Sequence, residues 1–415
     1  MEDNFLDIAP NDWTRSDDII KVLGVGGGGC NAVNYMYSQG IKGCSFAVCN
    51  TDAQALRCSP VPIQIQMGRG LGAGTNPING RNAAIESQDE IRRVIIDSNT
   101  KMLFITAGMG GGTGTGAAPV IAKMAKDKGI LTVAVVTLPF LNEGNEALSK
   151  ALDGVHELEK NVDSLLLINN EKLHEYFGNQ LLQDAFPQAD EVLATAVRGI
   201  VEIINKRGHI NVDFKDVETM MRDSGMALMG CGVGSGEDRI EKAVKAAFES
   251  PLLNDFDLKT AKKVLINITC GKNEQGLTMN DLNDINDKIS EYTGHANNFK
   301  RGIIFDDSPE IGDTVRITSI VTGLRFSDVI GVNRDMGNYI IINRNFVYDR
   351  NSMSREEGIS LQPDNSSQQI GFNSKSNTRK FNFDPENPPV LILREGEKIS
   401  EYESVPAIRR NVAAQ

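Results

Sequence analysis

A glycine-rich run at 108–116 has the residue types and spacing of a phosphate-binding loop. It reads Gly-Met-Gly-Gly-Gly-Thr-Gly-Thr-Gly, follows an apolar strand-like segment at 102–106 and precedes a helix-like segment at 117–128. Glycines at the start of a helix let backbone N–H groups approach an anion, which the helix dipole favours, and threonine hydroxyls add donors. The run predicts that Gly112, Thr113 and Gly114 hold phosphate. The alternative, a flexible linker, does not suit a position between a buried strand and a helix.

A second glycine cluster at 24–31 follows the apolar run 19–23 and opens into a segment that can be helical. Gly24, Gly26 and Gly29 fit the G-x-G-x-x-G dinucleotide fingerprint, and the acidic Asp52 follows about 20 residues later. Alone, this match leaves open a nicotinamide-dependent dehydrogenase, but a dehydrogenase does not explain the second, richer loop. The Walker pattern G-x-x-x-x-G-K-[ST] does not occur in the chain.

Together the two loops resemble those of the tubulin-like GTPases, in particular their bacterial cell-division members. The resemblance runs in order over roughly residues 17–345, and it continues in the segments 46–56, 70–77, 131–139, 211–217 and 234–239. It implies a self-assembling cytoskeletal protein of the bacterial division ring, with GTP hydrolysed to GDP and phosphate in head-to-tail filaments. The implied location is the cytoplasm, with assembly at midcell.

The resemblance also assigns residues to the nucleotide. It implies that the inner phosphates are bound by Gly27, Gly28, Gly29, Cys30 and Asn31. It also implies that the terminal phosphate is bound by Gly72, Ala73 and Gly74. Base and ribose are expected to be bound by Glu143, Phe186 and Asp190. Asp190 could instead be an ordinary acid near a helix N-terminus. Mg²⁺ is the cation expected to share the phosphate charge, but no dedicated carboxylate cage is visible, so no metal ligands are assigned.

Asp213 and Asp216 are the candidate catalytic residues. Their i, i+3 spacing places both carboxylates on one face of a helical turn, where they could polarise a water or help to hold a cation. The alternative is a helix N-terminus that simply carries acids. The resemblance favours catalysis and implies that this loop enters the nucleotide site of the next subunit, so that polymerisation activates hydrolysis.

The chain departs from the family pattern at three positions. Ala147 stands where the motif after Pro139 usually has an arginine, and Lys150, one turn on, is expected to substitute only in part. Lys215 separates the two aspartates where a small uncharged residue is usual, and we expect it to pair with one of them and lower its pKa. Cys30 replaces a glycine or small residue, which should be tolerated.

Alternating apolar and helical segments position these residues. Strands are expected at 19–24, 45–49, 102–107, 130–138 and 164–169, with helices at 28–39, 79–97, 113–128 and 146–160. This alternation predicts an α/β fold whose parallel sheet binds its ligand at the carboxyl ends of the strands, where both glycine loops fall. A long helix at 190–206 has a broad apolar face, and the strands that cluster after it predict an α+β second domain.

These elements divide the chain into six expected parts. They are a polar extension (1–16), a GTP-binding domain (17–186), a central helix with the start of the catalytic loop (187–212), an activation domain (213–347), a disordered linker (348–398) and a docking peptide (399–415). Strands at 226–233, 263–269, 301–306, 313–322 and 338–347 and helices at 237–249 and 278–292 are expected in the activation domain.

Composition narrows the class of protein. A net charge of −12 argues against a broad nucleic-acid surface, and the six cysteines form no C-x-x-C pair, which fits reduced thiols better than a zinc or disulfide framework. The acidic start lacks the features of a signal peptide, and no segment is apolar for the ~18 residues of a membrane span.

The final stretch mixes apolar and basic side chains after a polar, low-complexity segment. It resembles the family's docking peptide, which implies binding to membrane-tethering and regulatory division proteins through Tyr402, Val405, Pro406, Ile408, Arg409 and Arg410. An inert tail is the alternative. For the whole chain the competing hypothesis is a filament or scaffold that binds nucleotide but turns it over poorly, suggested by Ala147 and Lys215.

Overall fold

The computed structural model describes most of the chain up to residue 324 and parts of the remainder. The described residues are 18–96, 99–170, 182–205, 210, 212–249, 258, 261–274, 276–294, 298–306, 311–324, 339–343, 346–349, 360–364, 369–374 and 377–382. The expected N-terminal extension and the docking peptide, with all six of its named residues, lie outside them.

The first half of the chain forms a parallel sheet, as the alternating pattern predicts. Its strands are β1 (Ile20–Val25), β2 (Ser45–Asn50), β3 (Ile63–Gln66), β4 (Met102–Gly108), β5 (Leu131–Leu138) and β6 (Ser164–Asn169). They pair in the order β3-β2-β1-β4-β5-β6, and every pairing is parallel. The carboxyl ends of all six strands therefore meet at one edge of the sheet.

The second half extends the same sheet. Its strands are β7 (Gly225–Gly234), β8 (Lys263–Gly271), β9 (Asn298–Asp306) and β10 (Val315–Leu324). β6 and β7 pair in parallel over three residues, Ser164–Leu166 with Gly225–Ala227, and the order continues β7-β10-β8-β9, with β10 antiparallel to both of its neighbours. Ten described strands thus form one continuous sheet across the two expected domains.

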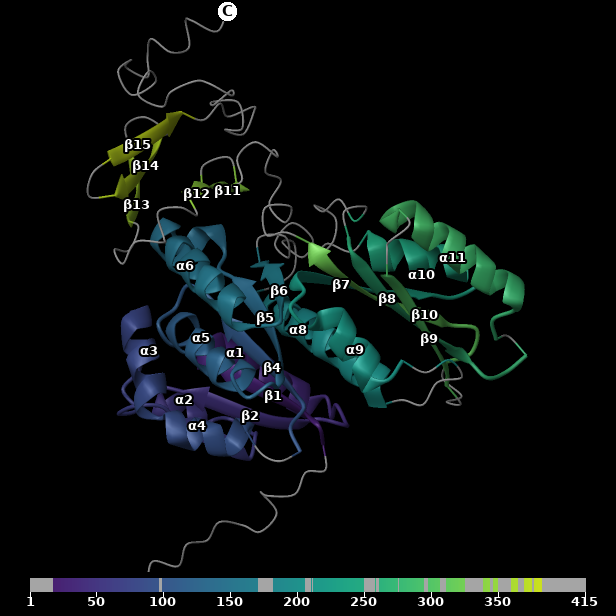
Figure 1. Cartoon of the computed structure of the whole chain (residues 1–415), viewed down its shortest axis with the longest axis horizontal. Coiled ribbons are helices and arrows are strands. Elements are labelled where there is room, and N and C mark those ends of the chain that lie inside the picture. The colour runs from purple at the N-terminus through teal and green to yellow at the C-terminus, as the bar shows by residue number, and fades with distance from the viewer. Residues whose placement is uncertain are drawn as a thin grey trace, which may run out of the picture.

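Helices cover both faces of this sheet (Figure 1). One face carries α1 (Gly26–Ser38), α2 (Ala53–Arg57), α8 (Leu182–Asn205) and α9 (Phe214–Met221), whose apolar residues share one core cluster. The other carries α3 (Pro77–Glu86), α4 (Gln88–Ile95), α5 (Thr113–Lys126), α6 (Asn145–Asn161), α10 (Arg239–Phe248) and α11 (Met279–Thr293). Apolar strands buried on both sides account for the near-continuous hydrophobic runs in the sequence.

The structure differs from the expected elements at several points. The single helix expected at 79–97 is divided at Ser87, which ends α3 and precedes α4, and the central helix begins at Leu182 rather than near residue 190. The strand expected at 338–347 is a hairpin of β11 (Tyr339–Asn343) and β12 (Phe346–Asp349).

The segment expected as a linker contains three strands that its composition did not predict. They are β13 (Ser360–Asp364), β14 (Gln369–Ser374) and β15 (Asn377–Asn382), which pair antiparallel in a separate small sheet. No hydrogen bonding between this sheet and the ten-stranded sheet occurs in the described strands.

Candidate nucleotide site

The two glycine loops lie at the carboxyl ends of neighbouring strands. Gly26 begins α1 immediately after β1, and the run from Met109 to Gly112 joins β4 to the first turn of α5. The two strands are paired, so the helix N-termini approach each other, and a Cβ on Gly29 would collide with the Thr106 carbonyl. At Gly27 the opposite holds, because a Cβ there would meet no described atom within 4 Å. Gly27 therefore faces open space at the mouth of the two helices.

A third loop, the one that carries Gly72 and Gly74, completes the cradle. The hydroxyls of Thr51 and Thr113 are 2.6 Å apart, which joins the end of β2 to the start of α5. Gly72 N–H donates to the Thr51 carbonyl at 2.9 Å. A Cβ on Gly112 would lie 2.8 Å from both the Ala73 Cβ and the Asn76 nitrogen. The structure thus brings together the residues expected around the phosphates.

The residues expected around base and ribose come from two further elements. Glu143 ends a short 3-10 helix (Leu141–Glu143) after β5, is exposed, and accepts from Phe140 N–H at 2.9 Å. The glycine loop packs against the start of α6, which follows this segment, since a Cβ on Gly110 would lie 3.0 Å from the Ala147 carbonyl. Phe186 and Asp190 both lie on α8, although the Phe186 side chain lies outside what the structure describes. Burial raises the pKa of Asp190 to about 6.

Lys150 contacts the cradle, although not as an arginine would. Its ammonium donates to the Thr75 carbonyl at 3.2 Å and pairs with Glu146 at 2.6 Å on the same helix. Thr75 has a positive φ of 57°, which is unusual for a residue other than glycine. Lys150 therefore links α6 to the third loop through a single ammonium group. It does not have the bidentate geometry of the arginine that the family usually carries at the position of Ala147.

Asp213 and Asp216 lie at the opposite edge of the sheet from the cradle. The last residue of α8, Asn205, donates from Nδ2 to the Gly43 carbonyl at 2.9 Å, just before the amino end of β2. At the other end of α9, Arg222 donates to the Gly129 carbonyl at 3.2 Å, just before the amino end of β5. Both ends of the segment that carries Asp213 and Asp216 are therefore held at the amino-terminal edge, whereas all three loops of the cradle lie at the carboxyl edge.

The two aspartates form the N-terminal capping box of α9. Asp216 N–H donates to Asp213 Oδ1 at 2.8 Å, and Asp213 N–H donates to Asp216 Oδ2 at 3.4 Å. The two acids therefore do cap a helix N-terminus, which was the alternative to a catalytic role. The capping box holds both carboxylates at the start of one helix. It does not oppose a catalytic role, because a capping carboxylate keeps lone pairs for another partner.

The pairing expected of Lys215 is wrong. Its ammonium pairs with Glu218 at 2.5 Å, three residues further along α9, because an i, i+3 partner lies on the same helix face. The cation beside the aspartates is Lys300, from β9, 2.8 Å from Asp216 Oδ1, and its hydrogen bond is the main cause that lowers the pKa of Asp216. Sequence reasoning did not identify Lys300, since nothing in its neighbourhood marks the contact.

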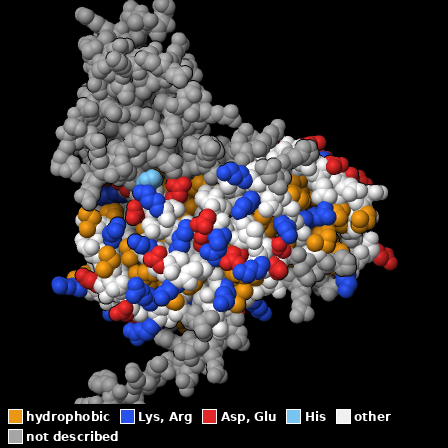
Figure 2. All heavy atoms as spheres, viewed as in Figure 1, with side chains coloured by type: hydrophobic (Ala, Val, Ile, Leu, Met, Phe, Trp, Pro, Cys, Tyr) orange, Lys and Arg blue, Asp and Glu red, His pale blue; other side chains and the backbone are white. Residues whose placement is uncertain are grey.

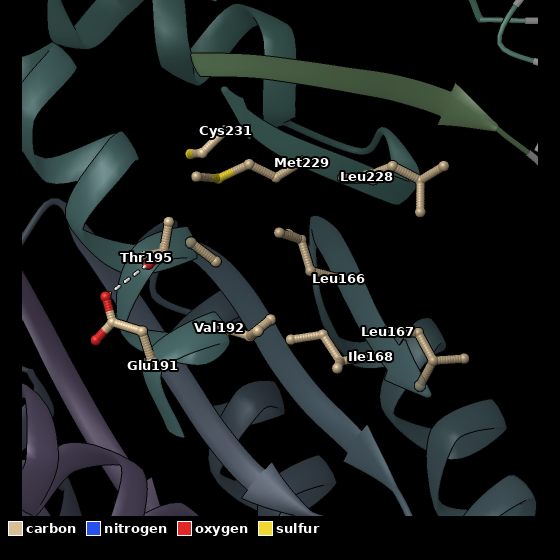
Figure 3. A pocket seen from close by; sticks show the side chains of 11 residues that line it. Leu166, Leu167, Ile168, Glu191, Val192, Thr195, Leu228, Met229 and Cys231 are labelled. Atoms are coloured by element: carbon tan, nitrogen blue, oxygen red, sulfur yellow. Dashed lines mark hydrogen bonds between the residues drawn. The ribbon is translucent and has the colours of Figure 1, made fainter. Parts of the chain in front are cut away.

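Other features of the described residues do not resemble a nucleotide site. A cavity of about 180 Å³ lies between β6, α8 and β7, with mostly apolar lining such as Leu166, Val192 and Met229, and Thr195 donates to Glu191 Oε1 at its rim at 3.3 Å (Figure 3). Within the described ranges no group of three or more histidine, cysteine or acidic residues could hold a metal ion. Nor is any described helix long and apolar enough to cross a membrane.

The fold and the cradle define a tubulin-like nucleotide-binding protein. A parallel sheet carries three loops at its carboxyl edge, a long helix leads to a second α+β part, and acidic residues stand at the far edge. Comparison with known proteins agrees. The model of the Tubulin/FtsZ family, GTPase domain, matches residues 19–178, and that of the FtsZ family, C-terminal domain, matches residues 225–325.

Relatives and solved structures support the same assignment. The cell division protein FtsZ of Porphyromonas gingivalis is 44% identical over 82% of this chain and 75% of its own length. That of Azotobacter vinelandii is 48% identical over 74% of this chain and 77% of its own length. The solved structure of an empty FtsZ dimer from M. jannaschii superposes with a TM-score of 0.68 at 38% identity, over 81% of this chain and 93% of that one.

The chain therefore belongs to the Tubulin/FtsZ family and carries both the GTPase domain and the C-terminal domain of FtsZ. It is a GTPase of the tubulin-like cytoskeletal class. This assignment excludes the alternative function, a nicotinamide-dependent dehydrogenase, which the first glycine cluster alone left open.

Proposed function

We propose that this protein hydrolyses GTP at the contact between successive subunits of a head-to-tail filament in bacterial cell division. The cradle of one subunit binds the nucleotide, and Asp213 and Asp216 of the next subunit orient the attacking water. The relatives named above are cell division proteins, and one solved neighbour is a dimer, which supports self-association.

The observation that carries this proposal is the separation of the two halves of the site. Asn205 anchors the segment before the aspartates beside Gly43, at the edge of the sheet opposite to Gly27. Phosphoryl transfer requires the phosphates to be held and a water to be placed in line with the bond that breaks. A single copy provides only the first, whereas a second copy stacked in the same direction brings its aspartates to the first copy's cradle.

The remaining roles follow from where the side chains lie. Backbone N–H groups at the starts of α1 and α5 bind the phosphates, and the hydroxyl of Thr113, which contacts that of Thr51, lies at the start of α5. A divalent cation such as Mg²⁺, bound together with the nucleotide, would reduce the charge of the phosphates, and no described residue is assigned to hold it. Glu143, Phe186 and Asp190 bind base and ribose.

The C-terminal tail is proposed to attach filaments to membrane-tethering division proteins at midcell. Residues 399–415 combine apolar side chains with Arg409 and Arg410, a composition that suits docking onto a partner protein. A short segment that folds onto a partner binds weakly and exchanges readily, since the ordering entropy offsets much of the contact energy.

The direct test measures GTP hydrolysis per subunit as a function of protein concentration. Turnover per subunit should be near zero in dilute solution and rise above a threshold at which sedimentable polymer appears. Turnover that stays constant down to dilute monomer would contradict a shared site. A nucleotide-binding scaffold would polymerise with GTP but release almost no phosphate at any concentration.

Mixing two inactive variants sharpens the test. Asp213→Ala keeps its cradle, and Gly27→Val keeps its aspartates. Where a Gly27→Val subunit presents its aspartates to an Asp213→Ala cradle, the contact has both halves. The mixture should therefore release more phosphate than the sum of the two proteins measured alone. A mixture no more active than that sum would oppose transfer of the carboxylates between subunits.

A further inference from the structure

The strand β9 runs alongside the segment that leads to the catalytic aspartates. Ile303 N–H donates to the Ile210 carbonyl at 3.0 Å, and the two residues form an isolated bridge. A Cβ on Gly302 would approach the Val212 side chain to 3.0 Å, so the absence of a side chain there lets the two segments lie close. These contacts bring Lys300, near the start of β9, beside the first turn of α9.

Lys300 interacts with both carboxylates of the capping box. Its ammonium lies 2.8 Å from Asp216 Oδ1, whereas Asp216 Oδ2 accepts from Asp213 N–H. The hydrogen bond to Asp216 is the main cause that raises the pKa of Lys300, and the charge of Asp213 raises it further. Half of the Lys300 side chain remains exposed, so it lies at the surface that the aspartates present.

Electrostatics explains why a cation is useful at this place. Two carboxylates on one helical turn repel each other, and in the filament both would face the triphosphate of the neighbouring subunit. A lysine fixed beside one carboxylate reduces both repulsions and holds that carboxylate in one orientation. In the view of Figure 2, basic and acidic side chains are interspersed over the middle of the described surface. On and just after α9, Lys215 and Arg222 pair with Glu218 rather than with an aspartate of the box.

We propose that Lys300 is a positioning residue for GTP hydrolysis, which orients Asp216 and offsets the charge of the aspartate pair as it meets the next subunit's nucleotide. This role rests on the shared site proposed above. Lys300 itself touches neither the nucleotide nor the water, but acts through Asp216. Two other roles of Lys300 predict different results. If Lys300 competed with the water or a cation for Asp216, removing its charge would raise turnover, and if the pair had no influence on hydrolysis, turnover would not change.

The test compares Lys300→Gln, which removes the charge at similar length, with Lys300→Arg, which keeps it. Lys215→Gln is the matched control, because that lysine lies on the same helix as Asp216 but pairs with Glu218. Turnover is measured at saturating GTP and expressed per sedimented subunit, so that a change in assembly does not count as a change in hydrolysis. Nucleotide affinity is measured separately on dilute subunits.

We expect Lys300→Gln to lower turnover about three- to fivefold, the upper part of the range for losing one partly exposed charge pair. The GTP affinity of dilute subunits should not change, Lys300→Arg should recover at least half of the activity, and Lys215→Gln should stay within about twofold of the parent.

The outcomes separate this inference from the proposed function. If Asp216→Asn is inactive but Lys300→Gln is as active as the parent, or more active, the positioning role is overturned and the shared site stands. A failure of Lys300→Arg to restore turnover would also overturn it. If Asp216→Asn itself hydrolyses GTP normally, the proposed catalytic pair is wrong.

Discussion

The Asp163 carboxylate is buried at the start of β6, and the Arg222 guanidinium at the end of α9 approaches its Oδ1 at 3.7 Å. Lys126 lies 3.8 Å from the same oxygen, and Oδ2 accepts from Thr132 N–H at 2.9 Å. One buried acid therefore joins α5, β5, β6 and α9, the helix that Asp213 and Asp216 cap. Its contribution to stability should be appreciable, because the carboxylate is buried and its charge is compensated by both cations and by the Thr132 N–H.

Asp163→Asn is expected to lower the free energy of unfolding by about 2 kcal/mol, below the range for breaking a fully buried ion pair, because Lys126 and Arg222 are partly exposed and keep Asp223 and Glu218 as partners. The matched control is Asp223→Asn, which alters a 73% exposed partner of the same Lys126. It should cost less than about 1 kcal/mol. Urea unfolding of both variants measures the difference. Equal midpoints for the two would show that Asp163 does not anchor α9.

Two glycines of the cradle should respond differently to alanine. Gly27→Ala should leave the thermal midpoint of the nucleotide-free protein unchanged, since its Cβ meets no described atom, but should weaken GTP binding more than about tenfold, because the methyl enters phosphate space. Gly112→Ala, in contrast, should lower the thermal midpoint. Its free energy of unfolding should fall by about 2 kcal/mol, because the new Cβ would lie 2.8 Å from the Asn76 nitrogen.

Thermal unfolding without nucleotide and a GTP titration of each folded variant supply both numbers. A Gly27→Ala protein that binds GTP with the parent's affinity would show that this surface is not the phosphate site. A normal midpoint for Gly112→Ala would show that the third loop moves freely to accept a side chain.

The affinity for GTP should fall in acid through Asp190. Burial raises the pKa of this carboxyl to about 6, so it is mostly ionised at pH 7 and mostly protonated at pH 5. The proposed role requires the ionised form, which accepts from N–H donors of the base. Affinity should therefore decrease with falling pH, by about tenfold per unit below the pKa.

The comparison is with Asp190→Asn, which should bind more weakly at pH 7 and lose this component of the pH dependence. The nucleotide's own phosphates titrate in a similar range, so the difference between the two proteins is the quantity to measure. Parallel pH profiles for both would argue that Asp190 does not contact the ligand in its ionised form.

Lys150 should contribute modestly to nucleotide binding through the third loop. Lys150→Ala removes the contact with the Thr75 carbonyl and is expected to weaken GTP binding about two- to fivefold, with little change in stability. Lys160→Ala, on the same helix α6 with an exposed partner in Glu157, is the control and should not alter affinity. Isothermal titration of both variants decides whether Lys150 partly replaces the missing arginine.

The sequence predicted those parts of the molecule that depend on local pattern. The strand expected at 164–169 is β6, because a short apolar run bounded by polar residues leaves little choice of element. The division of the helix expected at 79–97 was not foreseen, since Ser87 is neither glycine nor proline, although its hydroxyl accepts from Gly68 N–H at 3.2 Å. That contact is long-range, and no local pattern encodes it.

The same distinction holds in the site. The glycine loops were recognised because composition and position after a strand suffice to identify them. Lys300 was missed and Lys215 was misassigned, because the contact depends on how β9 lies against α9 and not on neighbourhood in the chain. The pairing of β6 with β7, which merges two expected domains into one sheet, is likewise a matter of register between distant segments.

In the filament proposed above, the placement of cradle and aspartates on opposite edges of the sheet gives the row of subunits a direction. One terminal subunit leaves its cradle uncovered, and the other leaves Asp213 and Asp216 without a nucleotide to act on. A row always has one fewer complete site than it has subunits. The GTP bound at one terminus is therefore not hydrolysed, however long the row becomes. The two tips are therefore chemically different surfaces, and a molecule that recognises one of them has no reason to bind the other.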